Sequence, residues 1–307
     1  PTAMLKRTIL IENKSAVTTK NQQLVVKTDL RESTIPIEDI GFLVLDHAEI
    51  YLSIPAMNQL IENNTSIIIC GKNHLPNGLF MNLNSHYIQQ EIFRNQIEAS
   101  VPLKKQLWQQ TIIEKIKNQG LLLAKITKSA NSFEFLASKV LSGDTSNMEG
   151  VAAQNYWKNF PLPSKETDGL KRERYGDYPN NFLNYGYAIL RAATARALSG
   201  SGLLNTLGIH HKSKYNAFAL ADDIMEPFRP LVDEKVFEIM QHYDDQELNT
   251  TIKAELLQVL TRTVYFKDEK SPLMVALQKT ASSLQQCYTG DRKKIKYPKL
   301  WSLTDTE

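Results

Sequence analysis

The sequence predicts an α+β fold in which a small β-rich N-terminal domain precedes a larger all-α C-terminal domain. Short apolar runs of strand length dominate residues 1–85, whereas apolar residues recur at helical intervals from residue 101 onward. The composition is that of a folded protein, because 42% of the 307 residues are hydrophobic and 22% are charged. Global disorder is therefore excluded.

The N-terminal domain, residues 1–85, is expected to contain short strands and one helix. Strands are predicted at residues 7–12, 24–26, 41–45, 66–70 and 79–83, with a loop at 71–78. Pro36 lies between two isoleucines, and since proline cannot donate a backbone hydrogen bond, this segment is predicted to be an edge strand. The helix is expected to follow Ser53, which suits an N-cap, and to end at Asn63 and Asn64.

The C-terminal domain, residues 101–307, is expected to be helical and to follow a linker at residues 86–100. A first helix is predicted from Val101, because leucine and isoleucine recur at helical spacing after it. Further helices are predicted at residues 132–141, 149–160, 181–199, 213–225, 232–242, 250–264 and 271–287. Residues 161–180 are rich in Pro, Lys and Asp and are predicted to form a long polar loop, which is usually functional or mobile.

The charge is unevenly distributed between the two domains. Residues 1–100 carry 8 Lys or Arg and 10 Asp or Glu, a net charge of −2, whereas residues 101–307 carry 28 and 23, a net charge of +5. The helical domain is therefore the better candidate to bind a polyanion such as nucleic acid.

Cysteine content and hydropathy point to a cytoplasmic protein. Cys70 and Cys287 are the only cysteines, too few for a disulfide framework or a zinc site, and they fit a reduced compartment. No apolar run reaches the roughly 18 residues of a membrane span. No signal segment is expected at the start of the chain, and the three residues before Met4 are expected to be a non-native extension.

An acidic stretch at residues 220–230, Leu-Ala-Asp-Asp-Ile-Met-Glu-Pro-Phe-Arg-Pro, stands out as a candidate for chemistry. On a helix, Asp222, Asp223 and Glu226 could share one face, where their mutual repulsion would be relieved by a divalent cation or a nearby base. The two prolines are expected to interrupt or kink that helix. The alternative is an acidic first turn of the next helix, and the residues alone favour it, since charge clusters are usually surface features.

A histidine and a further glutamate could complete such a site. His211 follows His210 directly, and a neutral histidine ring suits a divalent metal or acid–base chemistry, although a lone histidine is more often structural. Glu149 lies where the sequence predicts the change from a polar loop to a helix, a position in which a carboxylate usually interacts only with the helix dipole. From the residues alone, a Glu/His/Glu metal site is a minority hypothesis.

Four motifs in a fixed order carry a family resemblance. They are Asn147-Met-Glu-Gly150, Asn184-Tyr-Gly-Tyr187, Gly208-Ile-His-His211 and Ala221-Asp-Asp-Ile-Met-Glu-Pro-Phe-Arg-Pro-Leu-Val-Asp233. Over nearly its whole length, the chain closely resembles the CRISPR-associated integrases that insert new spacers into a CRISPR array. It most resembles members from systems with a single large RNA-guided effector nuclease. Each motif is weak alone, but the four in order are specific.

The resemblance implies a metal-dependent DNA integrase and endonuclease. It assigns the catalytic and metal-binding roles to Glu149, His211 and Glu226, with Mg²⁺ or Mn²⁺ as the ion. The 3′-hydroxyl ends of short DNA fragments would then be joined to the ends of a CRISPR repeat by transesterification. The family histidine lies 15 positions before its acidic partner, which places it on His211 rather than His210. Asp222 and Asp223 are then expected to orient His211 or a basic neighbour.

The resemblance also implies partners. They are double-stranded DNA as spacer precursor and as CRISPR repeat, a second copy of the chain in a homodimer through the N-terminal domain, and a small ferredoxin-like CRISPR partner protein in a higher-order complex. The RNA-guided nuclease is a further candidate partner. Two other functions stay open: a stand-alone metal-dependent nuclease on branched DNA, and a catalytically inactive DNA-binding scaffold.

Six basic residues are candidates to contact DNA phosphates. They are Arg172, Arg174, Arg191, Arg196, Lys212 and Arg229. The first two lie in the polar loop at 161–180, whereas Arg191 and Arg196 could instead form structural ion pairs. Arg229 could equally neutralise Asp222 or Asp223 beside it.

Overall fold

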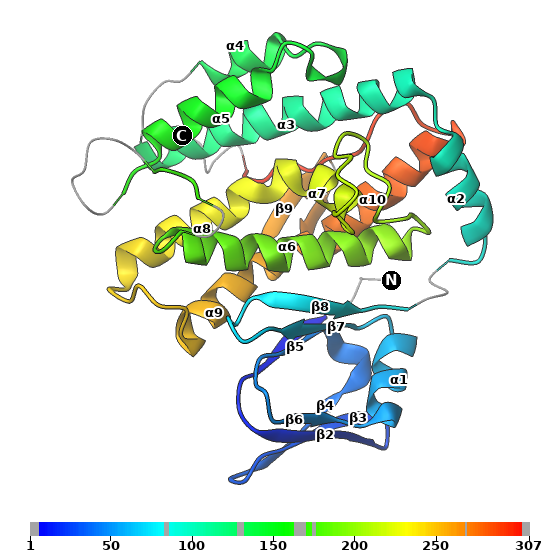
Figure 1. The fold of residues 1–307 in the computed structure, drawn as a ribbon, viewed down its shortest axis with the longest axis vertical. Helices are drawn as coiled ribbons and strands as arrows, with labels where there is room; N and C mark the ends of the chain where they lie inside the picture. Colours follow the sequence, from blue (N-terminus) through cyan, green and yellow to red (C-terminus); the bar gives the residue numbers. More distant parts are fainter. Residues whose placement is uncertain are drawn as a thin grey trace.

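The α+β fold class is confirmed by the computed structural model, in which a β-rich N-terminal region lies against a larger, mostly helical region (Figure 1). The structure describes residues 6–82, 86–127, 132–162, 170–173, 176–267 and 269–302. Within these ranges, no helix is both long and apolar enough to cross a membrane.

Two four-stranded sheets form the N-terminal region and enclose a small apolar core between them (Figure 1). One sheet has the strand order β1-β5-β7-β8, and the other has the order β4-β3-β2-β6. The strands are β1 Arg7–Ile11, β2 Ser15–Lys20, β3 Gln23–Lys27, β4 Glu32–Pro36, β5 Ile40–Leu45, β6 Ile50–Leu52, β7 Ser66–Cys70 and β8 Pro76–Phe80. Strand β4, which contains Pro36, lies at a sheet edge as predicted.

The first sheet is buried on both faces. Along β5, Leu43 and Leu45 belong to the core between the two sheets, whereas Phe42 and Val44 belong to the core of the helical region. Successive side chains of a strand point to opposite faces, so a single strand serves both cores. This arrangement explains why the strand is apolar at every position rather than at alternate ones.

The predicted helix of the N-terminal region is confirmed as α1, Ile54–Glu62. Its N-cap is Ser53, whose side chain accepts a hydrogen bond from the backbone N–H of Ala56 at 3.3 Å. After the C-cap Asn63, the chain turns at Asn64, which has a φ of 56°. Asparagine tolerates this left-handed conformation better than most residues, which is why the asparagine pair marks the helix end.

The helical region is layered over strand β8, with α6 next to the sheet, α3 beyond it, and α4 and α5 outermost (Figure 1). The helices are α2 Gln89–Glu98, α3 Val101–Thr127, α4 Phe133–Ser138, α5 Met148–Asn159, α6 Asn180–Gly200, α7 Ala219–Met225, α8 Arg229–His242, α9 Thr250–Leu257 and α10 Leu273–Thr289. A short antiparallel hairpin of β9 Thr263–Phe266 and β10 Glu269–Pro272 accompanies them.

The predicted linker at residues 86–100 is instead mostly helical, because it contains α2. The buried face of α2 includes Ile92 and Gln96. The side-chain amide of Gln96 donates to the carbonyls of Leu204 and Leu207 and accepts from the N–H of Leu204. Because the buried Gln96 is polar, it interrupts the spacing of apolar residues along α2, and the sequence therefore did not indicate a helix here.

Other element boundaries also differ from the prediction, and three of them have a clear cause. Strand β8 begins at Pro76, inside the predicted loop 71–78. The helix predicted from residue 213 starts only at Ala219, because the side chain of Asn216 binds the N–H of Phe218 and forms a local turn. The helix predicted to continue to residue 264 gives way to the β9–β10 hairpin, whose four-residue strands are too short for a clear alternating pattern.

A buried ion cluster ties the helical region to the sheet. The ammonium group of Lys253 on α9 lies 2.9 Å from Glu12 Oε1 and 2.6 Å from Asp46 Oδ2, and all three side chains are almost fully buried. Burial lowers the pKa of Lys253, but its bonds to Asp46 and Glu12 outweigh this and raise it. The lysine therefore stays charged between the two regions.

Replacing Lys253 should weaken the junction between the regions. We expect Lys253→Met to lower the free energy of unfolding by about 3 kcal/mol, because two buried carboxylates lose their counter-charge. Urea unfolding followed by circular dichroism measures this. Lys14→Met is the matched control, since Lys14 meets Glu49 at 3.9 Å with both side chains more than half exposed, and it should cost under about 1 kcal/mol. Equal losses in the two variants would contradict the prediction.

Candidate active site

The ammonium group of Lys115 joins Glu149 to Glu226, two glutamates that lie far apart in the sequence. Lys115 Nζ is 2.6 Å from Glu149 Oε1 and 2.6 Å from Glu226 Oε2, and the lysine side chain is only 11% exposed. The contact with Glu149 is a directed hydrogen bond. Glu226 Oε2 is buried, and the Lys115 ammonium is the charged group in contact with it.

Glu149 is positioned by the first turn of α5. The carboxylate of Asp144 accepts hydrogen bonds from the N–H groups of Met148 and Glu149, at 2.9 and 3.0 Å, and so satisfies two free donors of the helix start. Asn147 precedes the helix in a left-handed conformation, with a φ of 52°. The Glu149 side chain is 28% exposed, so one of the two glutamates is open to solvent.

Glu226 is positioned by an interruption between α7 and α8. Residues Glu226–Phe228 form a 3₁₀ turn, and Pro227 and Pro230 interrupt the helix as expected. The Asn118 side chain on α3 donates to the carbonyl of Pro227 at 2.8 Å, which ties this turn to the helix that carries Lys115. The turn directs the Glu226 carboxylate into the interior.

The charge state of Glu226 follows from its two basic neighbours. Arg229 Nε lies 2.8 Å from Glu226 Oε1. Burial alone would raise the pKa of Glu226, but Arg229 and Lys115 more than compensate and lower it to about 2. Glu226 is therefore ionised at neutral pH, although its side chain is only 6% exposed. Arg229 neutralises Glu226 rather than Asp222 or Asp223.

Asp223 fixes the orientation of His211. The fully buried Asp223 carboxylate accepts hydrogen bonds from the N–H groups of Ile209 and His210 and from His211 Nδ1, at 2.5, 2.9 and 2.6 Å. The bond from the ring raises the pKa of His211, although burial opposes this. With Nδ1 bound to the carboxylate, Nε2 is the ring nitrogen left to face a ligand.

The two adjacent histidines differ in what their rings can do. The His210 ring stacks on Trp108 with a centroid separation of 4.3 Å and an interplanar angle of 3°. The His211 side chain meets Trp108 only edge-on and is 41% exposed. Both histidines line the groove and reach solvent, but only the His211 ring is oriented by a buried carboxylate.

The structure brings Glu149 and Glu226 together at the Lys115 ammonium, whereas Asp223 holds the His211 ring. Across the described ranges, no group of three or more His, Cys, Asp or Glu side chains could hold a metal ion as the side chains stand. The cause is local, because the Lys115 ammonium fills the position between the carboxylates and Asp223 holds the His211 ring. The donors still fit a divalent cation, since they include an ionised glutamate with an unsatisfied buried oxygen, a second glutamate and a free imidazole nitrogen.

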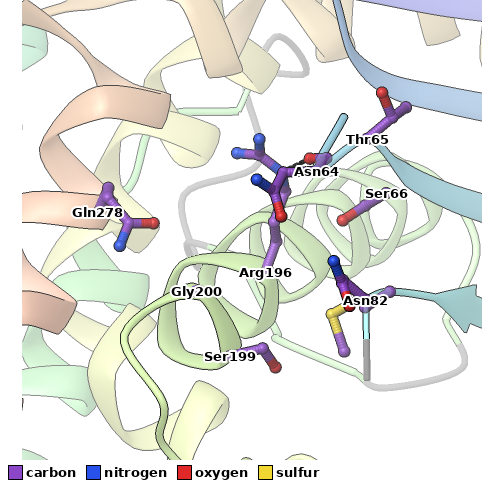
Figure 2. A pocket seen from close by; sticks show the side chains of 9 residues that line it. Asn64, Thr65, Ser66, Asn82, Arg196, Ser199, Gly200 and Gln278 are labelled. Atoms are coloured by element: carbon purple, nitrogen blue, oxygen red, sulfur yellow. Dashed lines mark hydrogen bonds between the residues drawn. The ribbon is translucent and has the colours of Figure 1, made fainter. Parts of the chain in front are cut away.

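The arginines predicted to bind DNA are largely engaged within the protein. Arg191 Nε lies 2.6 Å from Asp222 Oδ1, so Asp222 is paired with a neighbouring helix and with Asn216 rather than with His211. Figure 2 shows Arg196 projecting from α6 toward Asn64, and its Nε donates to the Asn64 carbonyl at 2.8 Å. Both arginines therefore hold elements of the fold together.

The polar loop at 161–180 is described only in part. Arg172 donates to the side chains of Asn180 and Asn184, at 2.9 and 2.6 Å, and its guanidinium lies over the Tyr187 ring. Arg229 lies over the same ring at 4.6 Å. Arg174 lies outside the described residues.

An open groove beside His211 is lined by lysines, whereas the predicted arginines described above have partners inside the protein. Its volume is about 1140 Å³, and Trp108 and both histidines form part of its wall. Four lysines also line it, namely Lys104, Lys105, Lys212 and Lys214. None of them forms an ion pair with any carboxylate that the structure describes. Of the five predicted DNA contacts that the structure describes, only Lys212 lies in this groove.

Sequence reasoning missed Lys115. The residue lies on the buried face of α3, three positions after Ile112 and one before Ile116, both fully buried. A lysine on the apolar face of a long helix needs a buried counter-charge, and this was the available signal. The spacing could not show which acidic residues would supply it.

Known proteins are similar to this chain in sequence and in fold. A family described as "CRISPR associated protein Cas1" matches residues 8–267. The CRISPR-associated endonuclease Cas1 of Neisseria meningitidis serogroup C (strain 8013) is 33% identical over 310 residues, which cover 98% of this chain and 99% of that protein.

Two solved structures share the fold at a TM-score of 0.74 and 20% identity. One is a casposase bound to an integration product, with 94% of this chain and 92% of that chain covered. The other is a Cas6-RT-Cas1–Cas2 complex, with 97% of this chain and 36% of that chain covered. Since the family match covers most of the sequence and a relative is 33% identical along its whole length, the chain belongs to the Cas1 family of CRISPR-associated proteins.

Proposed function

We propose that this chain is a divalent-metal-dependent DNA integrase and endonuclease of CRISPR adaptation. It would join the 3′-hydroxyl ends of short DNA fragments to the ends of a CRISPR repeat by transesterification. The observation that carries the proposal is the buried, ionised Glu226 that shares the Lys115 ammonium with Glu149. Membership of the Cas1 family and the fold shared with a casposase support the reaction class.

Glu149, Glu226 and His211 Nε2 would hold the ion. A bound Mg²⁺ or Mn²⁺ would stabilise charge on the attacked phosphate and make the 3′-hydroxyl more acidic. The imidazole ligand favours Mn²⁺ in affinity, since Mg²⁺ prefers oxygen ligands. Arg229 keeps Glu226 ionised, and Asp223 directs Nε2 outward. With water in place of the 3′-hydroxyl, the same residues would support DNA cleavage.

The groove beside His211 is the surface that we propose for the DNA backbone. Its four lysines supply positive charge next to the candidate site. Flexible lysines at the rim can follow a phosphate backbone without reading its sequence. This assignment replaces Arg191, Arg196 and Arg229, whose guanidinium groups have partners inside the protein.

The proposed partners follow from the family. A homodimer through the N-terminal sheets and a complex with a small ferredoxin-like CRISPR protein are expected, and the fold shared with a Cas6-RT-Cas1–Cas2 complex supports a higher-order assembly. The RNA-guided nuclease is a further proposed partner. Because the substrates would be chromosomal and invading DNA, the expected location is the cytoplasm.

A catalytically inactive DNA-binding scaffold is the second candidate function. The observation that favours it is the Lys115 ammonium, which fills the position between the carboxylates. An inactive scaffold would bind DNA without binding Mn²⁺, whereas an integrase needs both. Joining of a labelled 3′-hydroxyl fragment to a repeat-containing plasmid separates the integrase from a scaffold and from a stand-alone nuclease.

Glu149→Gln should abolish strand transfer and leave the fold intact. The change removes one charged ligand and no core volume, and we expect the rate of fragment joining to fall by at least about 100-fold. Circular dichroism and DNA affinity should stay near wild-type values. Glu134→Gln is the matched control, since Glu134 is 79% exposed on the neighbouring helix α4. Joining at the wild-type rate by Glu149→Gln would overturn the assignment.

Asp223→Asn should lower the pKa of His211. The hydrogen bond from His211 Nδ1 to the Asp223 carboxylate raises that pKa, and a neutral amide stabilises the imidazolium less. An NMR titration of the His211 ring measures the shift. Asp222→Asn is the control, because Asp222 pairs with Arg191, and it should change the pKa of His211 less. A His211 pKa unchanged by Asp223→Asn would show that this hydrogen bond is absent in solution.

DNA affinity should depend steeply on salt, and the groove lysines should carry that dependence. Each neutralised duplex phosphate contributes about −0.9 to the slope of log K against log salt. Lys212→Ala and Lys214→Ala should therefore each reduce the slope by about one unit, irrespective of DNA sequence. Arg191→Gln should leave the slope unchanged, since Arg191 is paired with Asp222. Titration of a labelled duplex at several salt concentrations tests this, and the reverse ranking would locate the DNA elsewhere.

A further inference from the structure

We infer that Lys115 is a built-in counter-ion, which occupies the divalent-cation position in the metal-free protein and is displaced when the ion binds. The inference rests on the proposed function, because it takes Glu149 and Glu226 to be metal ligands. Lys115 would thus be a positioning residue, which keeps the two carboxylates adjacent and ready for the ion.

The first support is geometric. One ammonium nitrogen lies 2.6 Å from an oxygen of each glutamate. Two ionised carboxylates that close repel each other strongly, so without a cation one of them would take up a proton. The Lys115 ammonium lies in contact with both carboxylates and its side chain is only 11% exposed. The lysine therefore remains charged and performs the task of a shared cation.

The second support is the charge balance. Glu149 and Glu226 contribute −2, and the two bases that touch them, Lys115 and Arg229, contribute +2, so the metal-free cluster is neutral. A divalent ion that entered with both bases in place would leave the cluster at +2. In a buried setting an uncompensated charge is strongly unfavourable. Replacement of one base by the ion lowers that excess from +2 to +1, so the ion is expected to displace one of them.

The third support identifies Lys115 as the base that leaves. Arg229 binds Glu226 Oε1 through a directed hydrogen bond and also lies over the Tyr187 ring, so it is held from two sides. Lys115 is held by its ion pairs with the two carboxylates. Of these, Glu149 is the partly exposed one. Displacing the lysine frees one oxygen on each glutamate and leaves the Arg229 contact intact.

The effect of removing Lys115 on metal affinity distinguishes a displaced counter-ion from a lysine that only supports the fold. If the ammonium competes with the ion for the same position, its removal should tighten metal binding while it destabilises the metal-free protein. A lysine that only supports the fold would, on removal, weaken metal binding or leave it unchanged.

Direct Mn²⁺ binding to the full-length protein, measured from the free-ion signal in electron paramagnetic resonance, tests the inference. We expect Lys115→Met to lower the Kd for Mn²⁺ by at least about tenfold, because a positive charge within contact distance is removed. Its melting temperature should fall without metal and rise further than that of the wild type when Mn²⁺ is added. Lys115→Arg, which keeps the charge, should bind Mn²⁺ no more tightly than the wild type.

Lys125→Met is the matched control. Lys125 lies ten residues further along α3 and pairs with Glu234 at 2.7 Å, so this variant also loses one lysine ion pair from the same helix. It should leave the Kd for Mn²⁺ unchanged. A Kd for Lys115→Met that equals or exceeds the wild-type value would overturn the inference, as would equal tightening in Lys125→Met. Absence of Mn²⁺ binding by the wild type and by Lys115→Met would instead overturn the proposed function.

The wild-type protein provides a second measurement should Lys115→Met fail to fold. In a ¹⁵N-lysine-labelled sample without metal, the buried Lys115 ammonium should exchange its protons slowly. Saturation with Mg²⁺ should shift this resonance or remove it by faster exchange, whereas the Lys125 signal should not move. A Lys115 signal that is unchanged although Mg²⁺ binds would show that the ammonium keeps its place, which contradicts the inference.

Discussion

Helix α3 brings a lysine into the protein interior, and the arrangement of the helical region depends on how that charge is compensated. Two glutamates from distant segments meet the ammonium of Lys115, one from the first turn of α5 and one from the 3₁₀ turn between α7 and α8. Asn118, one turn further along α3, binds the carbonyl of Pro227 and holds that turn in place. A buried charge is tolerated only when it is paired, so the same contacts assemble the candidate site and stabilise the fold around it.

The basic side chains discussed above fall into two groups: some form ion pairs or hydrogen bonds within the protein, and others form no ion pair among the described residues. Arg191, Arg196 and Arg229 each have a carboxylate or carbonyl partner inside the molecule. The groove lysines have no such partner within the described part of the chain. Arginine suits internal contacts, because its planar group makes several directed hydrogen bonds, whereas lysine is a flexible point charge. Four lysines without an ion pair among the described residues thus lie together beside His211.

Local signals in the sequence predicted much of the fold. The β5 strand is apolar at every position, Ser53 caps α1, and Pro36 marks an edge strand, and all three appear as expected. One error arose where a distant partner decides the outcome. Helix α2 was hidden because Gln96 is satisfied by backbone groups more than a hundred residues away.

Long-range contacts also limited what the sequence could say about the candidate site. The motif spacing selected His211 rather than His210, but only the fold shows that Asp223 binds the His211 ring while Asp222 pairs with Arg191. The resemblance named Glu149 and Glu226, yet it did not reveal the ammonium between them.

Strand β5 makes folding of the two regions cooperative. Since its two faces belong to different cores, neither half of the chain has a complete interior without the other. The protein should therefore fold and unfold as a single unit. A cut between the regions would expose an apolar, aggregation-prone sheet face rather than release two separate stable domains.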